Sequence, residues 1–316
     1  MKNELKKFTF KLLASPQRRL NFLLFSLFLL FFPVQNSYAS LDFEIKRPLV
    51  RNIDYKLSEP EIYPIHTGVN APLLSARSAI VVDVDSKAVL LAKNPNAQLF
   101  PASTTKMMTA IITRQTFDIN QIITVPEEFE AIGQTMKLES KEKITIENLL
   151  YGLLVASGND TADVLSISDP EGKQKFIKKM NEKAKQLRLE KTVFKNSSGI
   201  EQAGHISSTH DLAILAAEFL KDPLLSKIVK TRKITVSDES GEIEHEMENI
   251  NELLGKVRGL KGIKTGWTAN SGECLVSYTE RDNKKIIVAI LGSADRFGET
   301  EALVEWAFAN HEWKNL

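Results

Sequence analysis

The chain of 316 residues contains one cysteine, Cys274, and carries a net charge of only +1. A single thiol can form neither an intramolecular disulfide nor a cysteine-rich metal site. The small net charge gives no sign of a nucleic-acid-binding surface or a charged tail. The five histidines form no His-Glu-x-x-His pattern, so we interpret His205 and His210 as structural or capping residues and expect no metal site. Internal repeats and low-complexity runs are also lacking.

The composition is that of an ordinary soluble globular protein, with 43% hydrophobic and 26% charged residues. The N-terminus is different. A basic segment, residues 1–19, is followed by an uncharged apolar run over 20–34 and by a small-x-Ala ending at Ala39. This order is typical of a secretory signal, and the run is shorter than the roughly 20 residues of a membrane-spanning helix. We expect cleavage after Ala39, with an uncleaved membrane anchor as the alternative.

Residues 40–73 have several prolines and no clear hydrophobic period, which predicts a linker or arm before a domain over 74–316. Strand patterns open and close that domain, and helical patterns fill its middle. We therefore expect an α/β (α+β) fold, with a mainly antiparallel sheet flanked by helices and an inserted all-helical lobe. The expected strands are 79–84, 88–93, 273–278 and 285–292, and the expected helices are 146–154, 170–188, 209–220 and 298–308.

The first segment with chemical potential is Ser103-Thr-Thr-Lys106 at the expected start of a helix. Two residues three positions apart lie on one helix face. A serine hydroxyl becomes a nucleophile when a base removes its proton, and a lysine with a lowered pKa can be that base. Alone, the pattern is more typical of a serine that caps a helix beside a solvated lysine.

Two further segments stand out. The run Ser157-Gly-Asn159-Asp follows the apolar helix pattern; Ser157 could relay a proton and Asn159 could bind an amide, although the run also suits a helix C-cap. The run Lys264-Thr265-Gly266-Trp267 reads as a strand edge that presents an ammonium and a hydroxyl to an anion. Gly266 would keep that edge open for close approach. Its alternative is a plain polar edge strand.

The order Ser-x-x-Lys, Ser-x-Asn and Lys-Thr-Gly characterises β-lactamases and penicillin-binding proteins. With these motifs in that order, the chain resembles the low-molecular-mass D-alanyl-D-alanine carboxypeptidases, serine peptidase family S11, over about residues 74–308. Other segments are similar to that family as well. Two departures, Ser197 and Ile200, lie away from the motifs. The similar segments are 157–160, 194–200 with the following 205–211, 249–254 and 272–276.

The resemblance implies a β-lactamase/transpeptidase-like fold and acyl transfer without a cofactor. It implies that Ser103 attacks the carbonyl between two D-alanines with Lys106 as base, and that Ser157 and Lys264 protonate the departing D-alanine. Backbone N–H groups of Ser103 and Trp267 would form the oxyanion hole. Peptidoglycan stem peptides become the expected substrates, and β-lactams the expected covalent inhibitors. The substrate-binding residues implied are Asn159, Lys264, Thr265, Gly266, Trp267 and Arg296.

Three alternatives remain open at the level of sequence. A D,D-endopeptidase that cuts peptidoglycan cross-links fits a chain with little sequence after the last helix pattern. A β-lactamase would need a deacylating glutamate, and Glu171, Glu182 and Glu190 do not occur in a Glu-x-x-Leu-Asn setting. A non-enzymatic binding module would have lost the reactive residues, which are all present. We expect action in the periplasm or at the outer face of the cytoplasmic membrane.

Overall fold

The structure, a computed structural model, describes residues 16–17, 21, 23–24, 62–130 and 132–315. The chain divides into two compact units, residues 1–56 and 57–316, and the fold described below is that of the second unit. The predicted signal segment, 1–39, lies almost entirely outside the described residues. Among the helices of the described ranges, none has the length and apolar character needed to cross a membrane.

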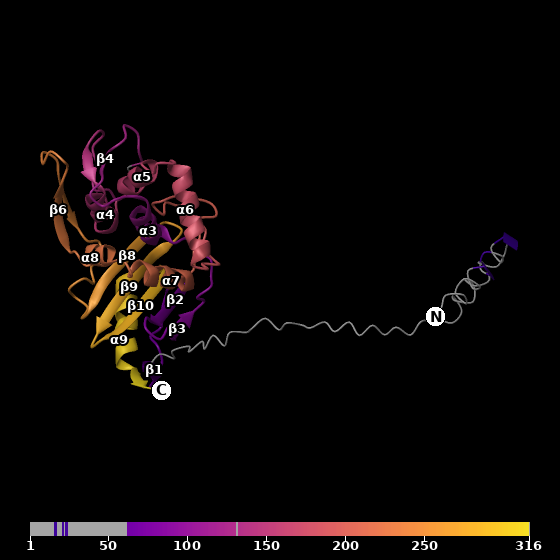
Figure 1. Cartoon of the computed structure of the whole chain (residues 1–316). Coiled ribbons are helices and arrows are strands. Elements are labelled where there is room, and N and C mark those ends of the chain that lie inside the picture. Colours follow the sequence, from indigo (N-terminus) through magenta and orange to yellow (C-terminus); the bar gives the residue numbers. More distant parts are fainter. Residues whose placement is uncertain (1–15, 18–20, 22, 25–61, 131, 316) are drawn as a thin grey trace, which may run out of the picture. The chain divides into compact units, whose positions relative to one another are not determined.

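An antiparallel five-stranded sheet forms the centre of the second unit, with the order β3-β2-β10-β9-β8 (Figure 1). The predicted strands are confirmed, and strands from both ends of the sequence meet in this sheet. For example, Val81 of β2 lies opposite Val288 of β10. β8 therefore forms one edge of the described sheet. Its strands are β2 (Ser78–Asp83), β3 (Val89–Lys93), β8 (Leu260–Thr268), β9 (Gly272–Arg281) and β10 (Lys284–Ser293).

Side chains alternate between the two faces of this sheet, because successive residues of a strand point in opposite directions. On β10, Ile287 and Ala289 face the helical lobe, whereas Val288 and Ile290 pack against α9. Both faces are thus covered by helices, which explains why β10 is apolar over its whole centre. The predicted fold class is confirmed.

The helices form three groups. Most belong to the lobe, α7 packs between the lobe and one face of the sheet, and the last helix, α9, packs on the other face of the sheet. The 3-10 helix η1 leads directly into α3, which runs through the middle of the lobe (Figure 1). The four predicted helices, α4, α6, α7 and α9, are confirmed within a few residues at their ends. The helices of this unit are η1 (Ala102–Thr105), α3 (Lys106–Thr116), α4 (Ile146–Leu154), α5 (Asn159–Ile167), α6 (Lys173–Gln186), α7 (Thr209–Phe219), α8 (Pro223–Ile228) and α9 (Arg296–Ala309).

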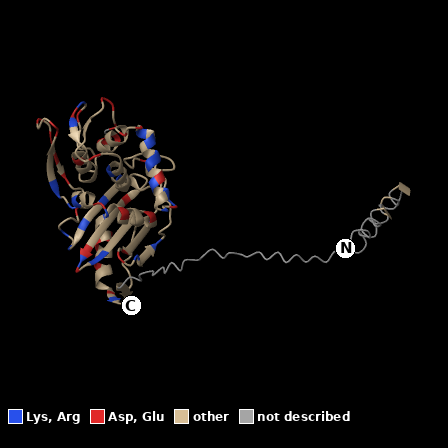
Figure 2. Ribbon diagram, viewed as in Figure 1, with Lys and Arg blue, Asp and Glu red and all other residues tan. Residues whose placement is uncertain are grey.

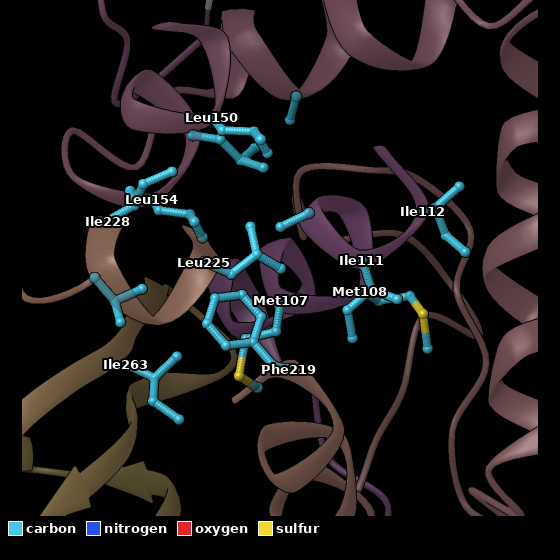
Figure 3. Close-up of a cluster of buried hydrophobic side chains, with 14 of the residues drawn as sticks. Met107, Met108, Ile111, Ile112, Leu150, Leu154, Phe219, Leu225, Ile228 and Ile263 are labelled. Atoms are coloured by element: carbon cyan, nitrogen blue, oxygen red, sulfur yellow. The ribbon is translucent and has the colours of Figure 1, made fainter. Parts of the chain in front are cut away.

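The core of the lobe fixes α3 in place. Figure 3 shows Met107 and Phe219 close together, with side chains of α4, α8 and β8 around them. Met107, Met108 and Phe219 are fully buried. Because α3 begins at Lys106, this packing holds the preceding turn of η1 in a defined position against the sheet.

Three two-stranded ribbons complete the unit, and the sequence pattern does not predict them. The sequence pattern predicted an all-helical lobe. The lobe is instead mainly helical, because the ribbon β4–β5 belongs to it and β6–β7 lies beside it (Figure 1). Figure 2 shows that lysines gather on α6 and that acidic residues gather on the β6–β7 hairpin. The ribbons pair β1 (Ile62–His66) with β11 (His311–Asn315), β4 (Ile122–Thr124) with β5 (Lys143–Thr145), and β6 (Lys233–Ser237) with β7 (Glu244–Glu248).

The described part of the predicted linker, residues 62–73, begins with β1. This strand pairs antiparallel with β11, so that Ile62 lies opposite Asn315. The indole N–H of Trp306 in α9 donates to the carbonyl of Val69 at 2.9 Å. This stretch therefore packs on the unit instead of leading freely to it. The division into signal, linker and domain otherwise stays a prediction.

Candidate active site

Ser103 and Lys106 meet at the junction of η1 and α3. Ser103 lies within the 3-10 turn, and Lys106 is the first residue of α3. The Lys106 Nζ lies 2.9 Å from the Ser103 Oγ. The alternative interpretation, a serine that caps the helix beside a solvated lysine, is wrong. Lys106 is fully buried, and Ser103 contacts this lysine instead of capping the helix.

The lysine amine has two further oxygen partners. Its Nζ lies 2.6 Å from the Asn159 Oδ1 and 2.7 Å from the Ser198 carbonyl oxygen. Both of these oxygens can only accept hydrogen bonds, whereas a serine hydroxyl can also donate. A neutral amine has two N–H groups and one lone pair. Once the two N–H groups serve Asn159 and Ser198, the lone pair is directed at the Ser103 hydroxyl.

Lys106 is held in an environment that favours this neutral form. Burial, followed by the nearby positive charge of Lys264, lowers the pKa of Lys106 well below its usual value, and the Asp160 carboxylate partly opposes them. Desolvation penalises the charged form of a buried lysine. A lysine whose pKa is lowered in this way is suited to take a proton from Ser103.

Asn159 is oriented by a loop on the other side of the lobe. Its Nδ2 donates to the Ile132 carbonyl at 2.6 Å, and its backbone N–H donates to the Gln134 carbonyl at 2.7 Å. Because the amide nitrogen is engaged by Ile132, the amide oxygen faces Lys106. Asn159 is the first residue of α5, and Gly158 before it has φ −57°, so the C-cap interpretation of this run is wrong.

Ser157 and Lys264 form the second contact of the site. Ser157, in the connection between α4 and α5, has φ +58°, and its Oγ accepts from the Lys264 Nζ at 2.8 Å. The same Nζ donates to the Thr265 carbonyl at 3.0 Å. Burial, and then the charge of Arg296, lowers the pKa of Lys264 to about 7. This lysine can thus exchange a proton with Ser157 near neutral pH.

The β8 edge brings the third motif to the serine. Lys264 and Thr265 are buried, whereas 62% of the Trp267 surface is exposed. Gly266 lies against the backbone of Ser103, since a Cβ added to it would lie 2.9 Å from the Ser103 nitrogen. The sequence-based role of Gly266 as a point of close approach agrees with this contact.

Arg296 reaches the same edge from the first residue of α9. Its Nη1 donates to the Gly266 carbonyl at 3.1 Å, and its backbone N–H donates to a Glu273 carboxylate oxygen at 2.8 Å. Its buried Nε has no hydrogen-bond partner among the described residues. All the residues that the sequence singled out, including Arg296, therefore gather around η1 and β8.

Several supporting groups were given no role in the sequence analysis. Asp160 is buried, and its carboxylate accepts from the Met136 and Leu138 N–H groups, both at 3.2 Å. Gly199 has φ +88°, and a Cβ there would lie 1.9 Å from the Ala102 carbonyl oxygen. The similar-family segment 194–200 pointed to Ser198 and Gly199, whereas no side-chain pattern indicates the carbonyls of the 132–134 loop.

His205 supports the helix start from beneath. Its Nε2 lies 2.9 Å from the Thr105 Oγ1, and its Nδ1 accepts from the Lys195 N–H at 3.3 Å. Burial, and then the charge of Lys195, lowers the pKa of His205 to about 4. This histidine is therefore neutral at ordinary pH, with its proton on Nε2, and has the structural role expected from the sequence.

Comparison with known families gives one match, to the model of D-alanyl-D-alanine carboxypeptidases of peptidase family S11, over residues 65–295. That range contains Ser103, Lys106, Ser157, Asn159 and the Lys264–Trp267 run. It ends one residue before Arg296.

Curated relatives carry the same name. The chain is 32% identical over 246 residues to the D-alanyl-D-alanine carboxypeptidase DacF of Bacillus subtilis, covering 75% of this chain and 63% of that protein. It is 30% identical over 269 residues to DacC of Escherichia coli, covering 80% of this chain and 66% of that protein. The chain thus spans just under two thirds of the length of these relatives.

Solved structures agree with these relatives. The Streptomyces K15 DD-transpeptidase superposes with a TM-score of 0.72 at 26% identity, covering 76% of this chain and 100% of that one. Penicillin-binding protein D2 of Listeria monocytogenes, solved in an ampicillin-bound form, gives a TM-score of 0.67 at 28% identity, with coverage of 76% and 100%.

Proposed function

The chain belongs to the D-alanyl-D-alanine carboxypeptidase family, peptidase family S11, and from that premise we propose that it removes the terminal D-alanine from peptidoglycan stem peptides. The single observation that carries the proposal is the contact of a fully buried lysine amine with a serine hydroxyl, Lys106 Nζ to Ser103 Oγ at 2.9 Å. A serine activated in this way is suited to acyl transfer.

In the first half of the reaction, the Ser103 oxygen attacks the carbonyl carbon of the penultimate D-alanine while its proton moves to Lys106. The negative charge then falls on the carbonyl oxygen, where the N–H groups of Ser103 and Trp267 would receive it. The C–N bond breaks, the leaving nitrogen takes a proton from Ser157, and Lys264 replaces it across 2.8 Å. The proton that Lys106 took from Ser103 then passes to Lys264, so that Lys106 is neutral again and Lys264 is charged again before water attacks. The products are free D-alanine and an ester on Ser103.

In the second half, water takes the place of the leaving amine. A base removes its proton as the oxygen attacks the ester, and Ser103 regains a proton when the ester bond breaks. Lys106 is the group nearest to the serine oxygen that can serve both transfers. The shortened peptide leaves with a new carboxylate, and the enzyme returns to its first state.

Substrate recognition in this proposal depends on the terminal carboxylate. Lys264, Thr265 and Arg296 supply two cationic groups and a hydroxyl beside the β8 edge, and the Arg296 Nε is buried without a partner among the described residues. The positive charges of Lys264 and Arg296 would attract a carboxylate to this edge. Asn159 would hold the acyl side of the peptide.

Covalent labelling tests the nucleophile. Incubation of the protein with a fluorescent penicillin, followed by peptide mapping, is expected to place one adduct on Ser103 and to show none in Ser103→Ala. Ser208→Ala, at the N-cap of α7, serves as a matched serine control that should still be labelled. An adduct on another serine would refute the assignment of Ser103.

The bond that is cleaved needs a separate experiment. Offered a pentapeptide stem and a cross-linked dimer, the protein is expected to release free D-alanine from the pentapeptide at the higher rate. Preferential cleavage of the dimer would make it a D,D-endopeptidase instead.

We further propose that the protein is exported and acts at the outer side of the cytoplasmic membrane, where this substrate is found. Fractionation of cells with an antibody to residues 62–315 checks this location.

A further inference from the structure

His245 lies far from the reacting groups in the sequence but contacts the loop that orients Asn159. It is the second residue of β7, and only 4% of its surface is exposed. Its Nδ1 lies 2.9 Å from the Met136 carbonyl oxygen, and its Nε2 lies 2.8 Å from the Glu142 Oε1. The imidazole thus joins the β6–β7 hairpin to both ends of the segment 136–142.

The two partners of this ring set its protonation state. A carbonyl oxygen can only accept a hydrogen bond, and an ionised carboxylate can only accept one as well. A neutral imidazole has one N–H, so the two contacts require the imidazolium when Glu142 is ionised. The second Glu142 oxygen accepts from the Glu139 N–H at 2.9 Å. The geometry is that of a buried ion pair.

The surrounding charges support this form. The hydrogen bond that His245 donates to Glu142 is the main cause that raises the pKa of His245; burial opposes it, while the charges of Glu142 and Asp160 add to it. Glu244 and Glu246 on the same strand point to its exposed face. The charged or titratable side chains facing the ring or lining the adjoining cavity are Glu142, Asp160, Lys137, Glu139, Glu244, Glu246 and Glu248.

Met136, which the imidazole binds through its carbonyl, is held from two sides. Its N–H donates to the Asp160 carboxylate at 3.2 Å. Two residues earlier the Gln134 carbonyl accepts from the Asn159 N–H, and the Ile132 carbonyl accepts from the Asn159 Nδ2. Asn159 Oδ1 in turn accepts from Lys106. A short path of hydrogen bonds therefore leads from His245 through the loop to the base.

We propose that His245, as an imidazolium paired with Glu142, is a positioning residue that fixes the loop 132–138 and through it the Asn159 amide. This inference rests on the proposed function of the site. When His245 loses its proton, one of its two hydrogen bonds is lost, and the loop gains freedom where it meets Asn159. Catalysis is sensitive to such displacement because the reacting groups must be held in alignment.

The protonation state can be measured without any activity assay. In ¹⁵N-labelled protein, the imidazole nitrogens of His245 should both be protonated at about pH 6.5, where an ordinary histidine is half protonated. His205 provides the internal contrast, since it should be neutral there. Glu142→Gln should move the titration of His245 to lower pH. A neutral His245 at that pH would overturn the proposal even if the enzyme proved active.

The kinetic test compares His245→Gln and Glu142→Gln with Glu246→Gln, which removes an exposed carboxylate from the same strand. The first two are expected to lower the rate of penicillin acylation about tenfold, as for a slightly misplaced group, and the third to leave it unchanged. The ratio of wild-type to His245→Gln rates should be largest below about pH 6.5 and should decline as the pH rises through the pKa of His245.

The outcomes separate the two proposals. A wild-type protein inactive on stem peptides and penicillin refutes the proposed function, while the nitrogen shifts still test the ion pair. An active wild type with a pH-independent rate ratio, or with His245→Gln as fast as wild type, refutes the positioning role. If His245→Gln does not fold, Glu142→Gln, which keeps the shape of the carboxylate, supplies the same comparison.

Discussion

The site contains two buried lysines, and their surroundings differ although their burial is alike. Lys106 has two partners that can only accept, Asn159 and Ser198, and its third partner is the Ser103 hydroxyl. Lys264 has one such partner, the Thr265 carbonyl, and shares a hydrogen bond with Ser157. Burial lowers the pKa of both lysines, but the partners decide what each amine can do. Lys106 is arranged as a base, and Lys264 as a charge that can release a proton.

Replacement of Lys106 should have the largest effect. Lys106→Met removes the base, and we expect penicillin acylation to slow by about a thousandfold, within the range known for general bases. Lys106→Arg should be no better, because a guanidinium stays protonated. Stopped-flow acylation measures both variants. Lys178→Met on the exposed side of α6 is the control, and a loss of less than about tenfold in Lys106→Met would remove the base from our mechanism.

Replacement of Lys264 should show how its role differs from that of Lys106. Lys264→Met removes a charge near the substrate carboxylate and should lower kcat/KM by about a hundredfold, as for a lost charge-assisted contact. Lys264→Arg keeps the charge and should recover part of this loss, in contrast to Lys106→Arg. Steady-state release of D-alanine gives both values. Equal losses in the Arg and Met variants would mean that charge is not what Lys264 contributes.

The two glycines that contact η1 lie on the two sides of the site, one near each lysine, and the effects of replacing them on stability can be compared. Gly199 lies on the Lys106 side, and a Cβ there would lie 1.9 Å from the Ala102 oxygen; Gly266 lies on the Lys264 side, with 2.9 Å to the Ser103 nitrogen. Gly199→Ala should therefore destabilise the fold by about 3 kcal/mol, and Gly266→Ala by about 1 kcal/mol. Denaturant unfolding measures both. Gly241→Ala, at an open turn with φ +78°, controls for the positive φ of Gly199.

The pH dependence should show the smallest effect. The free enzyme needs Lys264 protonated, and the pKa of this lysine is lowered to about 7, so kcat/KM should fall as the pH rises through about 7. Lys106, whose pKa is lowered well below its usual value, must be neutral and limits the acid side. In Arg296→Gln, loss of the neighbouring charge should shift the alkaline limb upward. An unshifted limb would assign it to another group.

Much of this site follows from the sequence because its parts are side chains in short motifs. Ser103, Lys106, Ser157 and Lys264 each place a hydroxyl or an amine in the site, and these residue types can be recognised in the sequence. The fold follows from strand patterns at both ends and helical patterns between them. The structure adds where these groups meet, which no spacing in the chain specifies.

The remaining parts could not be predicted because their chemistry is that of the backbone. The Ser198 and Ile132 carbonyls would be the same in any residue, so nothing in their side chains indicates that they bind Lys106 and Asn159. The β6–β7 ribbon was missed for another reason. Its buried positions on β7 are His245 and Met247 between glutamates, a pattern with too little apolar content to suggest a strand.

The order of strands in the sheet has a consequence for how the chain folds. β2 pairs with β10, so contacts such as Ala79 with Ile290 join residues about two hundred positions apart. Non-local pairing of this kind raises the contact order and slows folding, because a long loop must close before any contact is gained. During synthesis β2 can pair at once with β3, but its other edge has no partner until β10 has been made. The central sheet therefore cannot be completed until nearly the whole chain has been made.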